Sequence, residues 1–212
     1  MTILVTAGPT REAIDPVRFL SNRSSGKMGY AIAEAAAMAG HRVILVSGPT
    51  NLDLPDRVDY IPVETAREMF DAVQHHIGMA DIAIFAAAVA DYRPACVPEH
   101  KIKKTGDSLT LELVKTADIL GSARNEFKFG GVLVGFAAET ENLEENAREK
   151  LQRKGCDLVV ANDVSKQGIG FDANDNQVSL IYPDHTEELP KNSKTHLAHL
   201  ILEHALKLAN TD

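Results

Sequence analysis

Glycines, serines and an asparagine gather in one short stretch near the start of this 212-residue chain, Leu20-Ser-Asn-Arg-Ser-Ser-Gly-Lys-Met-Gly29. It follows an apolar segment, Ile3-Leu-Val-Thr-Ala-Gly8, and leads into an alanine-rich segment that is typical of a helix. Gly26 and Gly29 allow a ligand to approach the backbone, and a helix that begins here presents free N–H groups and the positive end of its dipole. We therefore expect a phosphorylated ligand to bind at this point.

Basic side chains at three further places are candidate anion contacts. A lysine is a suitable point charge for a polyphosphate, and Lys150 and Lys154 share one helix face at the spacing i, i+4. Each set also has an ordinary alternative, because loop cations are usually solvated and the two lysines could pair with glutamates 144, 145 and 149. The candidates are Arg11, Arg18 and Arg23 in the first loop, Lys101-Ile-Lys-Lys104, and the pair Lys150 and Lys154.

One amide and one carboxylate are the other candidates. Asn22 offers an amide that holds a carbonyl beside a phosphate without adding charge, although an asparagine also forms turns. Asp91 follows the small residues Ala86-Ala-Ala-Val-Ala90, against which a planar ligand can lie. At the carboxyl edge of a sheet Asp91 could accept from a ribose hydroxyl or hold a cation, or it could simply cap a turn.

The sequence lacks the motifs of several familiar nucleotide, metal and catalytic sites. No Gly-x-Gly-x-x-Gly follows the first apolar segment, and Ser25-Gly-Lys-Met28 lacks the hydroxyl that would complete a P-loop. His196, His199 and His204 share a predicted helix without metal-site spacing, and no nucleophile motif stands out. A phosphate site without a nucleophile favours direct transfer between bound substrates.

The elements that must position these residues alternate between strand and helix. This order predicts an α/β fold with a Rossmann-like, three-layer, doubly wound and mostly parallel sheet, formed by one domain over residues 1–212. A flap over Val89–Thr116, with an alternating strand at Leu109–Val114, and a hairpin at Asn176–Leu189 extend it. The predicted strands are Ile3–Thr6, Val43–Ser47, Asp59–Val63, Ile82–Ala87, Val132–Phe136 and Leu158–Ala161. The predicted helices are Lys27–Ala39, Ala66–His76, Ala117–Asn125, Asn142–Arg153 and Lys194–Ala209.

Composition narrows the class of protein. The residues are 44% hydrophobic and 25% charged, as in a globular protein, and the formal net charge is −8. The acidic balance argues against nucleic acid or an anionic membrane as partner. No apolar run is long enough to span a membrane, the first residues do not resemble a signal peptide, and Cys96 and Cys156 are expected to be free thiols. We expect a cytoplasmic protein.

Eight motifs in order resemble the phosphopantothenate–cysteine ligase family of coenzyme A biosynthesis, the phosphopantothenoylcysteine synthetases. The resemblance covers nearly the whole chain. They are Val5-Thr-Ala-Gly-Pro-Thr-Arg-Glu12, Asp15-Pro-Val-Arg18, Ser21-Asn22, Ser24-Ser-Gly-Lys-Met-Gly29, Ala87-Ala-Val-Ala-Asp-Tyr-Arg93, Lys101-Ile-Lys-Lys104, Gly135-Phe-Ala-Ala-Glu-Thr140 and Ala161-Asn-Asp-Val164.

The resemblance implies a ligase that joins 4′-phosphopantothenate to L-cysteine with CTP and Mg²⁺ through an acyl-cytidylate, releasing pyrophosphate and then CMP. It implies catalytic roles for Asn22, Arg18 and Lys101, and Asp91 is the candidate metal ligand. Family members are generally dimers, so a homodimer is expected. The implied nucleotide-binding residues are Gly8, Ser24, Ser25, Gly26, Ala87, Ala88, Asp91, Lys101, Ala117, Asp118, Ile119, Phe136, Lys150 and Lys154.

Some points depart from the family or stay open. Thr116-Ala-Asp-Ile119 stands where the family often has Asn-Pro-Asp-Ile. No residue of the sequence distinguishes a preference for CTP from one for ATP. Many members are fused behind a flavin-dependent decarboxylase, so we expect a free-standing ligase or one half of such a fusion. The alternatives are a nicotinamide- or flavin-binding oxidoreductase and a non-catalytic nucleotide sensor. Tight NADH binding would favour the first, and nucleotide binding without pyrophosphate release the second.

Overall fold

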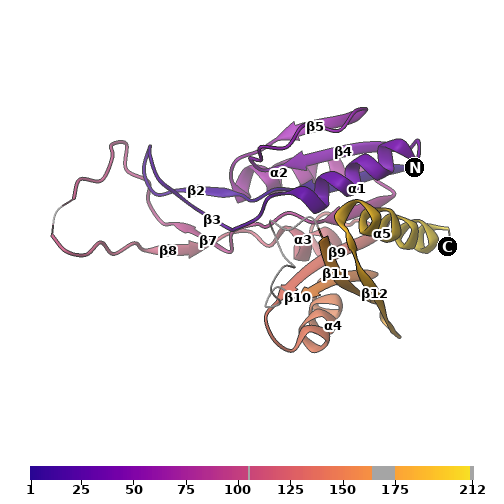
Figure 1. Ribbon diagram of the computed structural model, residues 1–212. Helices are drawn as coiled ribbons and strands as arrows, with labels where there is room; N and C mark the ends of the chain where they lie inside the picture. Colours follow the sequence, from indigo (N-terminus) through magenta and orange to yellow (C-terminus); the bar gives the residue numbers. More distant parts are fainter. Residues whose placement is uncertain (105, 164–174, 211–212) are drawn as a thin grey trace.

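Eight strands form one central sheet in the computed structural model, which describes residues 1–104, 106–163 and 175–210 (Figure 1). Their order is β12-β11-β10-β9-β6-β1-β4-β5, and the six strands from β10 to β5 are parallel. The strands are β1 (Thr2–Ala7), β4 (Arg42–Ser47), β5 (Val58–Pro62), β6 (Ile82–Phe85), β9 (Val132–Glu139), β10 (Leu158–Asp163), β11 (Asp175–Ile181) and β12 (Thr186–Ser193). The antiparallel hairpin β11–β12 closes one edge, as predicted.

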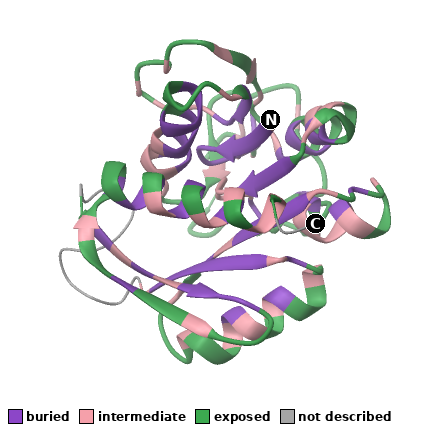
Figure 2. Ribbon diagram, turned by 90° about the vertical axis from the view of Figure 1, so that its right-hand side faces the viewer, coloured by how far each residue is buried: buried purple, intermediate pink, exposed green. Residues whose placement is uncertain are grey.

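Helices cover both faces of the sheet, so the fold has three layers. Alternate residues of each strand point to opposite faces, and near-continuous apolar strands fill two separate cores. Ile3 and Val5 lie in the core under α1 and α5, whereas Leu4 lies in the core under α2, α3 and α4 (Figure 2). The helices are α1 (Lys27–Met38), α2 (Ala66–His76), α3 (Ile119–Asn125), α4 (Leu143–Lys154) and α5 (Lys194–Ala209), with a 3-10 turn η1 at Ile77–Met79.

The predicted α/β class is confirmed, and most element boundaries differ by one to three residues. The helix predicted from Ala117 begins at Ile119, because the Asp118 carboxylate accepts from the N–H of Gly121 and caps it there. The strand predicted to Ala87 ends at Phe85. Val164, the last residue of the final motif, lies outside the described residues.

A long arm leaves the sheet at its carboxyl edge and carries four short strands that the sequence did not predict fully (Figure 1). We define the arm as residues 11–21 together with residues 92–115, of which 105 is not described. The strand expected over Leu109–Val114 is wrong for its first four residues. Only Leu113–Lys115 pair, because the facing strand is three residues long. The strands are β2 (Arg11–Ala13), β3 (Phe19–Ser21), β7 (Tyr92–Pro94) and β8 (Leu113–Lys115), paired β2–β3 and β7–β8.

Two glycines bring the start of α1 against the end of β1. Gly26 has φ +78° and precedes the helix, a left-handed backbone that glycine adopts without strain. A Cβ on Gly29 would lie 2.6 Å from the Cβ of Ala7. This close packing sets the amino terminus of α1 at the carboxyl edge of the sheet, where the glycine- and serine-rich stretch was expected to bind a phosphate.

Two further expectations concern cysteines and membranes. Both Cys96 and Cys156 are free thiols, as predicted, with Cys96 exposed and Cys156 buried. Among the described residues, no helix is long and apolar enough to cross a membrane.

Candidate active site

Two adjoining cavities form one crevice at the carboxyl ends of the parallel strands, where ligands of doubly wound sheets bind. Their volumes are about 590 and 420 Å³. The residues that line both are Ala87, Val89, Asp91, Phe136 and Lys150. The structure thus brings together predicted residues from the segments that follow β6 and precede α1, and from β9, α3 and α4, far apart in the sequence. The two ends of the crevice differ in chemistry.

The larger cavity is the cationic end. It is lined by Lys150, Arg153 and Lys154 of α4 and by the turn Thr116–Leu120 before and into α3. Lys150 donates to the backbone oxygen of Phe136 at 2.5 Å, and Lys154 pairs with Asp118. The alternative in which these lysines pair with their own helix's glutamates is not what the structure shows. Glu144 pairs with Arg148 instead.

Burial shifts the pKa values of the side chains at this end. Burial lowers the pKa of the Lys150 ammonium below its ordinary value, although Glu139 opposes the shift. Burial raises the pKa of the neighbouring Cys156 thiol to about 12, so this cysteine stays protonated at neutral pH. Burial would also raise the pKa of Asp118, but the hydrogen bonds from Lys154 and Gly121 hold it below its ordinary value. Lys150 is therefore a partly desolvated cation, whose attraction for an anion is stronger than in water.

The smaller cavity is the serine-rich end and holds the glycine- and serine-rich stretch. Cations also line it, namely Arg23, Lys27 and Lys194. Asn22, Ser24, Ser25 and Gly26 line it together with the small residues Ala86–Val89. Nδ2 of Asn22 donates to the backbone oxygens of Ala88 and Val89, each at 3.1 Å. Both amide hydrogens are therefore used within the protein.

The run that carries Ala87 and Asp91 is fixed from the first strand. Thr6 Oγ1 accepts from the N–H of Ala87 at 3.3 Å, and Thr10 Oγ1 accepts from the N–H of Ala90 at 3.0 Å. Both threonines are buried, so the small residues form a firm floor. Asp91 follows this floor, is exposed and lines both cavities.

Three polar residues of the serine-rich end were not assigned a role from sequence. Asn162, Asn176 and Lys194 line this cavity and are 9%, 6% and 7% exposed, unusually buried for these residue types. Asn162 lies in a quoted motif, which was a signal for it. Asn176 and Lys194 come from the antiparallel hairpin and from the start of α5, and no local pattern marks them.

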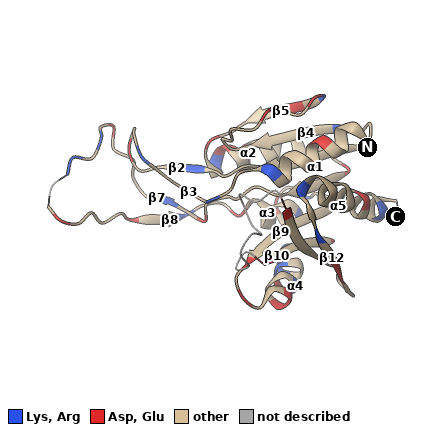
Figure 3. Ribbon diagram, viewed as in Figure 1, with Lys and Arg blue, Asp and Glu red and all other residues tan. Residues whose placement is uncertain are grey.

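Three of the predicted site residues lie elsewhere. Arg18 and Lys101 do not line the crevice; they line a separate cavity of about 540 Å³ in the arm, with Lys103 and Lys104 (Figure 3). Gly8 does not line either cavity of the crevice. Its φ is +70°, and a Cβ there would lie 2.7 Å from the backbone oxygen of Gly48, so Gly8 serves close backbone packing.

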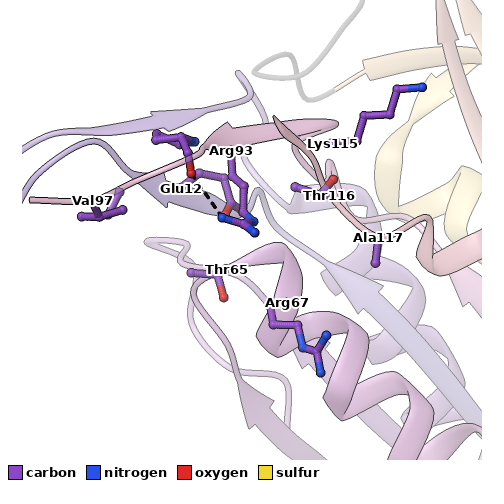
Figure 4. A pocket seen from close by; sticks show the side chains of 10 residues that line it. Glu12, Thr65, Arg67, Arg93, Val97, Lys115, Thr116 and Ala117 are labelled. Atoms are coloured by element: carbon purple, nitrogen blue, oxygen red, sulfur yellow. Dashed lines mark hydrogen bonds between the residues drawn. The ribbon is translucent and has the colours of Figure 1, made fainter. Parts of the chain in front are cut away.

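Another cavity, of about 600 Å³, lies between the base of the arm and α2. Its lining mixes apolar walls with Glu12, Arg67, Arg93 and Lys115. Figure 4 shows that the side chains of Arg67 and Lys115 point away from each other, so the cations do not converge on one point. Glu12 is committed to the backbone N–H of Ala66 at 2.8 Å. This cavity was not predicted and has no evident chemistry.

Comparison with known proteins gives consistent matches over nearly the whole chain. Residues 1–208 match the family described as DNA/pantothenate metabolism flavoprotein C-terminal domain. The coenzyme A biosynthesis bifunctional protein CoaBC of Vibrio vulnificus (strain YJ016) is 52% identical over 204 residues, 95% of this chain and 51% of that protein. Its counterpart in Bacillus subtilis (strain 168) is 50% identical over 209 residues, 98% of this chain and 51% of that protein.

A solved structure matches as well. The crystal structure of the C-terminal domain of a CoaBC protein has a TM-score of 0.85 and 44% identity, and the match covers 100% of this chain and 96% of that one. The chain therefore spans about half the length of the curated relatives that it matches, and it corresponds to their C-terminal domain.

Proposed function

Because this chain belongs to the family of DNA/pantothenate metabolism flavoprotein C-terminal domains, we propose that it is a phosphopantothenate–cysteine ligase of coenzyme A biosynthesis. The substrates are 4′-phosphopantothenate, L-cysteine and CTP. The observation that carries the proposal is the single crevice, in which lysines and arginines line both cavities and hydroxyl and amide groups gather in one of them. This lining suits a nucleoside triphosphate and a phosphorylated acyl substrate, which must meet at one phosphorus atom.

The first step transfers the nucleotide. A carboxylate oxygen of phosphopantothenate attacks the α-phosphorus of CTP, an O–P bond forms, and pyrophosphate leaves with the electrons of the broken P–O bond. Lys150 and Lys154 supply positive charge where two anions must approach each other. The alanine floor and Phe136 provide a surface for the ribose and base.

The second step forms the amide. The cysteine nitrogen attacks the acyl carbon, CMP leaves with the electrons of the broken C–O bond, and the amine loses a proton to water or phosphate. Asn22 lines the serine-rich end, and its amide hydrogens are bound to the backbone oxygens of Ala88 and Val89. Its oxygen can accept from the incoming amine, and the amide can turn one hydrogen to the acyl oxygen by giving up one backbone contact.

Mg²⁺ is the expected companion of the nucleotide. It neutralises phosphate charge, and it typically binds through one or two carboxylates plus phosphates and water. Asp91 is an exposed carboxylate at the junction of the two cavities, so it fits this role with the nucleotide completing the coordination. Among the described residues, no cluster of three acidic, histidine or cysteine side chains forms a protein-only metal site.

The arm supports a homodimer. Val17 and Leu109 on the arm are 61% and 55% exposed, and Phe19 is also exposed, which is unusual for apolar residues of this size. The arm also carries Arg18 and Lys101 away from the crevice. We propose that the arm packs on a second copy of the chain, covers this apolar surface and brings its cations to the partner's crevice.

The test is pyrophosphate release from purified protein with phosphopantothenate, cysteine and Mg²⁺, run in parallel with CTP and with ATP. The proposal expects release that requires both phosphopantothenate and CTP. A preference for ATP would support the ligase reaction but contradict the assignment of CTP as its nucleotide. No release with either nucleotide, from protein whose circular dichroism shows the α/β fold, would contradict the ligase and favour the nucleotide sensor. The free thiols agree with a cytoplasmic location, which fractionation of cells would test.

A further inference from the structure

Asp15, in the loop between β2 and β3, is an acidic residue to which neither the sequence nor the reaction assigns a role. Its side chain is fully buried although it lies in the arm, and it accepts five hydrogen bonds. Oδ1 accepts from the backbone N–H groups of Val17 and Arg18, each at 2.9 Å. Oδ2 accepts from the Arg18 guanidinium and from the N–H of Ile102 at 3.1 Å.

The two oxygens therefore have different tasks. Oδ1 closes a local turn, which is also held by the N–H of Ile14 donating to the backbone oxygen of Arg18 at 2.8 Å. Oδ2 joins this turn to a segment 87 residues later in the chain. Only the second task connects the two halves of the arm.

Arg18 completes the connection from the other side. Its Nη2 donates to Asp15 Oδ2 at 2.5 Å and to the backbone oxygen of Ile102 at 3.2 Å. The N–H and the carbonyl of Ile102 are thus both bound to the Asp15–Arg18 pair. Ile102 lies directly between Lys101 and Lys103, so the position of both lysines is set by this pair. The side chain of Arg18 is still 43% exposed. Its Nη1 has no partner among the described residues, so this nitrogen can bind an anion.

We propose that Asp15 is a positioning residue, which holds Arg18 and the segment Lys101–Lys104 together as one cationic unit. It touches no substrate; it acts through the two cations. Nε and Nη2 of Arg18 both donate to Oδ2 of the buried carboxylate, which restrains the guanidinium plane. Fixed charges stabilise a transition state better than mobile ones. This inference rests on the proposed function for its kinetic consequence, but the physical link between Asp15 and Ile102 is independent of any reaction.

Asp15→Asn separates the two tasks. The asparagine oxygen can still accept from the N–H groups of Val17 and Arg18, so the turn is kept. The NH₂ group then replaces Oδ2 and faces two donors, the Arg18 guanidinium and the N–H of Ile102, which removes the long-range contact. Asp71→Asn is the matched control, because Asp71 pairs with Arg67 at 2.9 Å on the exposed surface of α2.

The direct test is hydrogen exchange of the protein without substrates. Asp15→Asn should speed exchange of the Ile102 amide on the order of tenfold or more, whereas the amides of β1 and the Asp71→Asn control should exchange as in the wild type. Unchanged protection of Ile102 would overturn the proposal. This readout does not need a working ligase. It therefore distinguishes failure of the proposed contact between Asp15 and Ile102 from failure of the proposed function.

A kinetic cycle tests the consequence for catalysis. Asp15→Asn should lower kcat/KM on the order of tenfold to a hundredfold, because misplaced charges stabilise the transition state poorly. In a background of Arg18→Gln and Lys101→Gln, the same change should cost no more than about twofold, the usual error of additivity. An equal loss in both backgrounds would mean that Asp15 supports the fold generally, and it would overturn the positioning role.

Discussion

The ammonium group of Lys154 on α4 is paired with the carboxylate of Asp118, the residue that caps α3. Lys154 is only 12% exposed, whereas Asp118 is 55% exposed. The pair joins two helices across the cationic end of the crevice. A nucleotide that enters there meets a lysine that is already oriented and largely desolvated.

Lys154→Gln should therefore weaken nucleotide binding while leaving the fold intact. Asp118 keeps solvent contact and the N–H of Gly121, so stability should change by no more than about 1 kcal/mol. The KM for CTP should rise on the order of tenfold, as expected for one lost charge-assisted contact. Lys207→Gln is the matched control, because Lys207 pairs with Glu203 at 2.8 Å on α5, away from the crevice. Equal KM values for the two variants would contradict this role of Lys154.

Asn22→Asp should stop the reaction between its two steps. The carboxylate cannot donate to the backbone oxygens of Ala88 and Val89, and it adds charge beside the acyl group. We expect the acyl-cytidylate to form and its conversion to product to fall by at least about a hundredfold. Quenched reactions analysed by mass spectrometry measure both species. Asn210→Asp, beyond the end of α5, is the charge control, and normal turnover in Asn22→Asp would remove Asn22 from the mechanism.

Lys101→Gln should lower turnover even though Lys101 does not line the crevice of its own chain. The dimer proposal explains this, because the arm of one copy serves the partner. Mixing Lys101→Gln protein with Lys154→Gln protein should then restore activity, since every mixed dimer holds one intact site. Activity equal to the mean of the two variants, under conditions in which subunits exchange, would contradict a site shared between copies.

Acid should weaken the arm through Asp15. The Arg18 guanidinium, opposed by burial and aided by the three backbone N–H groups, holds the pKa of Asp15 far below its ordinary 3.8. The unfolded chain takes up this proton first as the pH falls, so the stabilisation is complete above about pH 4 and is lost below it. Urea unfolding between pH 5 and 2.5 should show a steeper loss of stability for the wild type than for Asp15→Asn. Identical slopes would contradict a strongly lowered pKa at Asp15.

Much of the sheet could be predicted because buried parallel strands are continuous apolar runs, and several of them lead to a helix signal. The arm was harder. Arg11-Glu-Ala13 and Phe19-Leu-Ser21 are three residues long and mixed in polarity, so no periodicity marks them. They become strands by pairing with each other, which local pattern does not reveal. The same reason explains why the strand predicted at Leu109 begins only at Leu113.

The candidate site could be predicted in part. Motif positions identified Lys150, Asp118 and Asn22, which the fold brings to one crevice. Sequence spacing did not reveal that Arg18 and Lys101 would lie in a separate cavity, because their separation depends on how far the arm extends from the sheet. It also gave no sign of Lys194, which reaches the crevice only because α5 begins beside α1.

The central claim is activation of the acyl group by a nucleotide, and a reaction without cysteine tests it most directly. Protein incubated with CTP, Mg²⁺ and phosphopantothenate is quenched and analysed by mass spectrometry, and cysteine is added to a second sample before quenching. The account predicts a phosphopantothenoyl-cytidylate in the first sample, and CMP with phosphopantothenoylcysteine in the second. CDP and phosphate in place of CMP and pyrophosphate, or no acyl-nucleotide with either CTP or ATP, would contradict it.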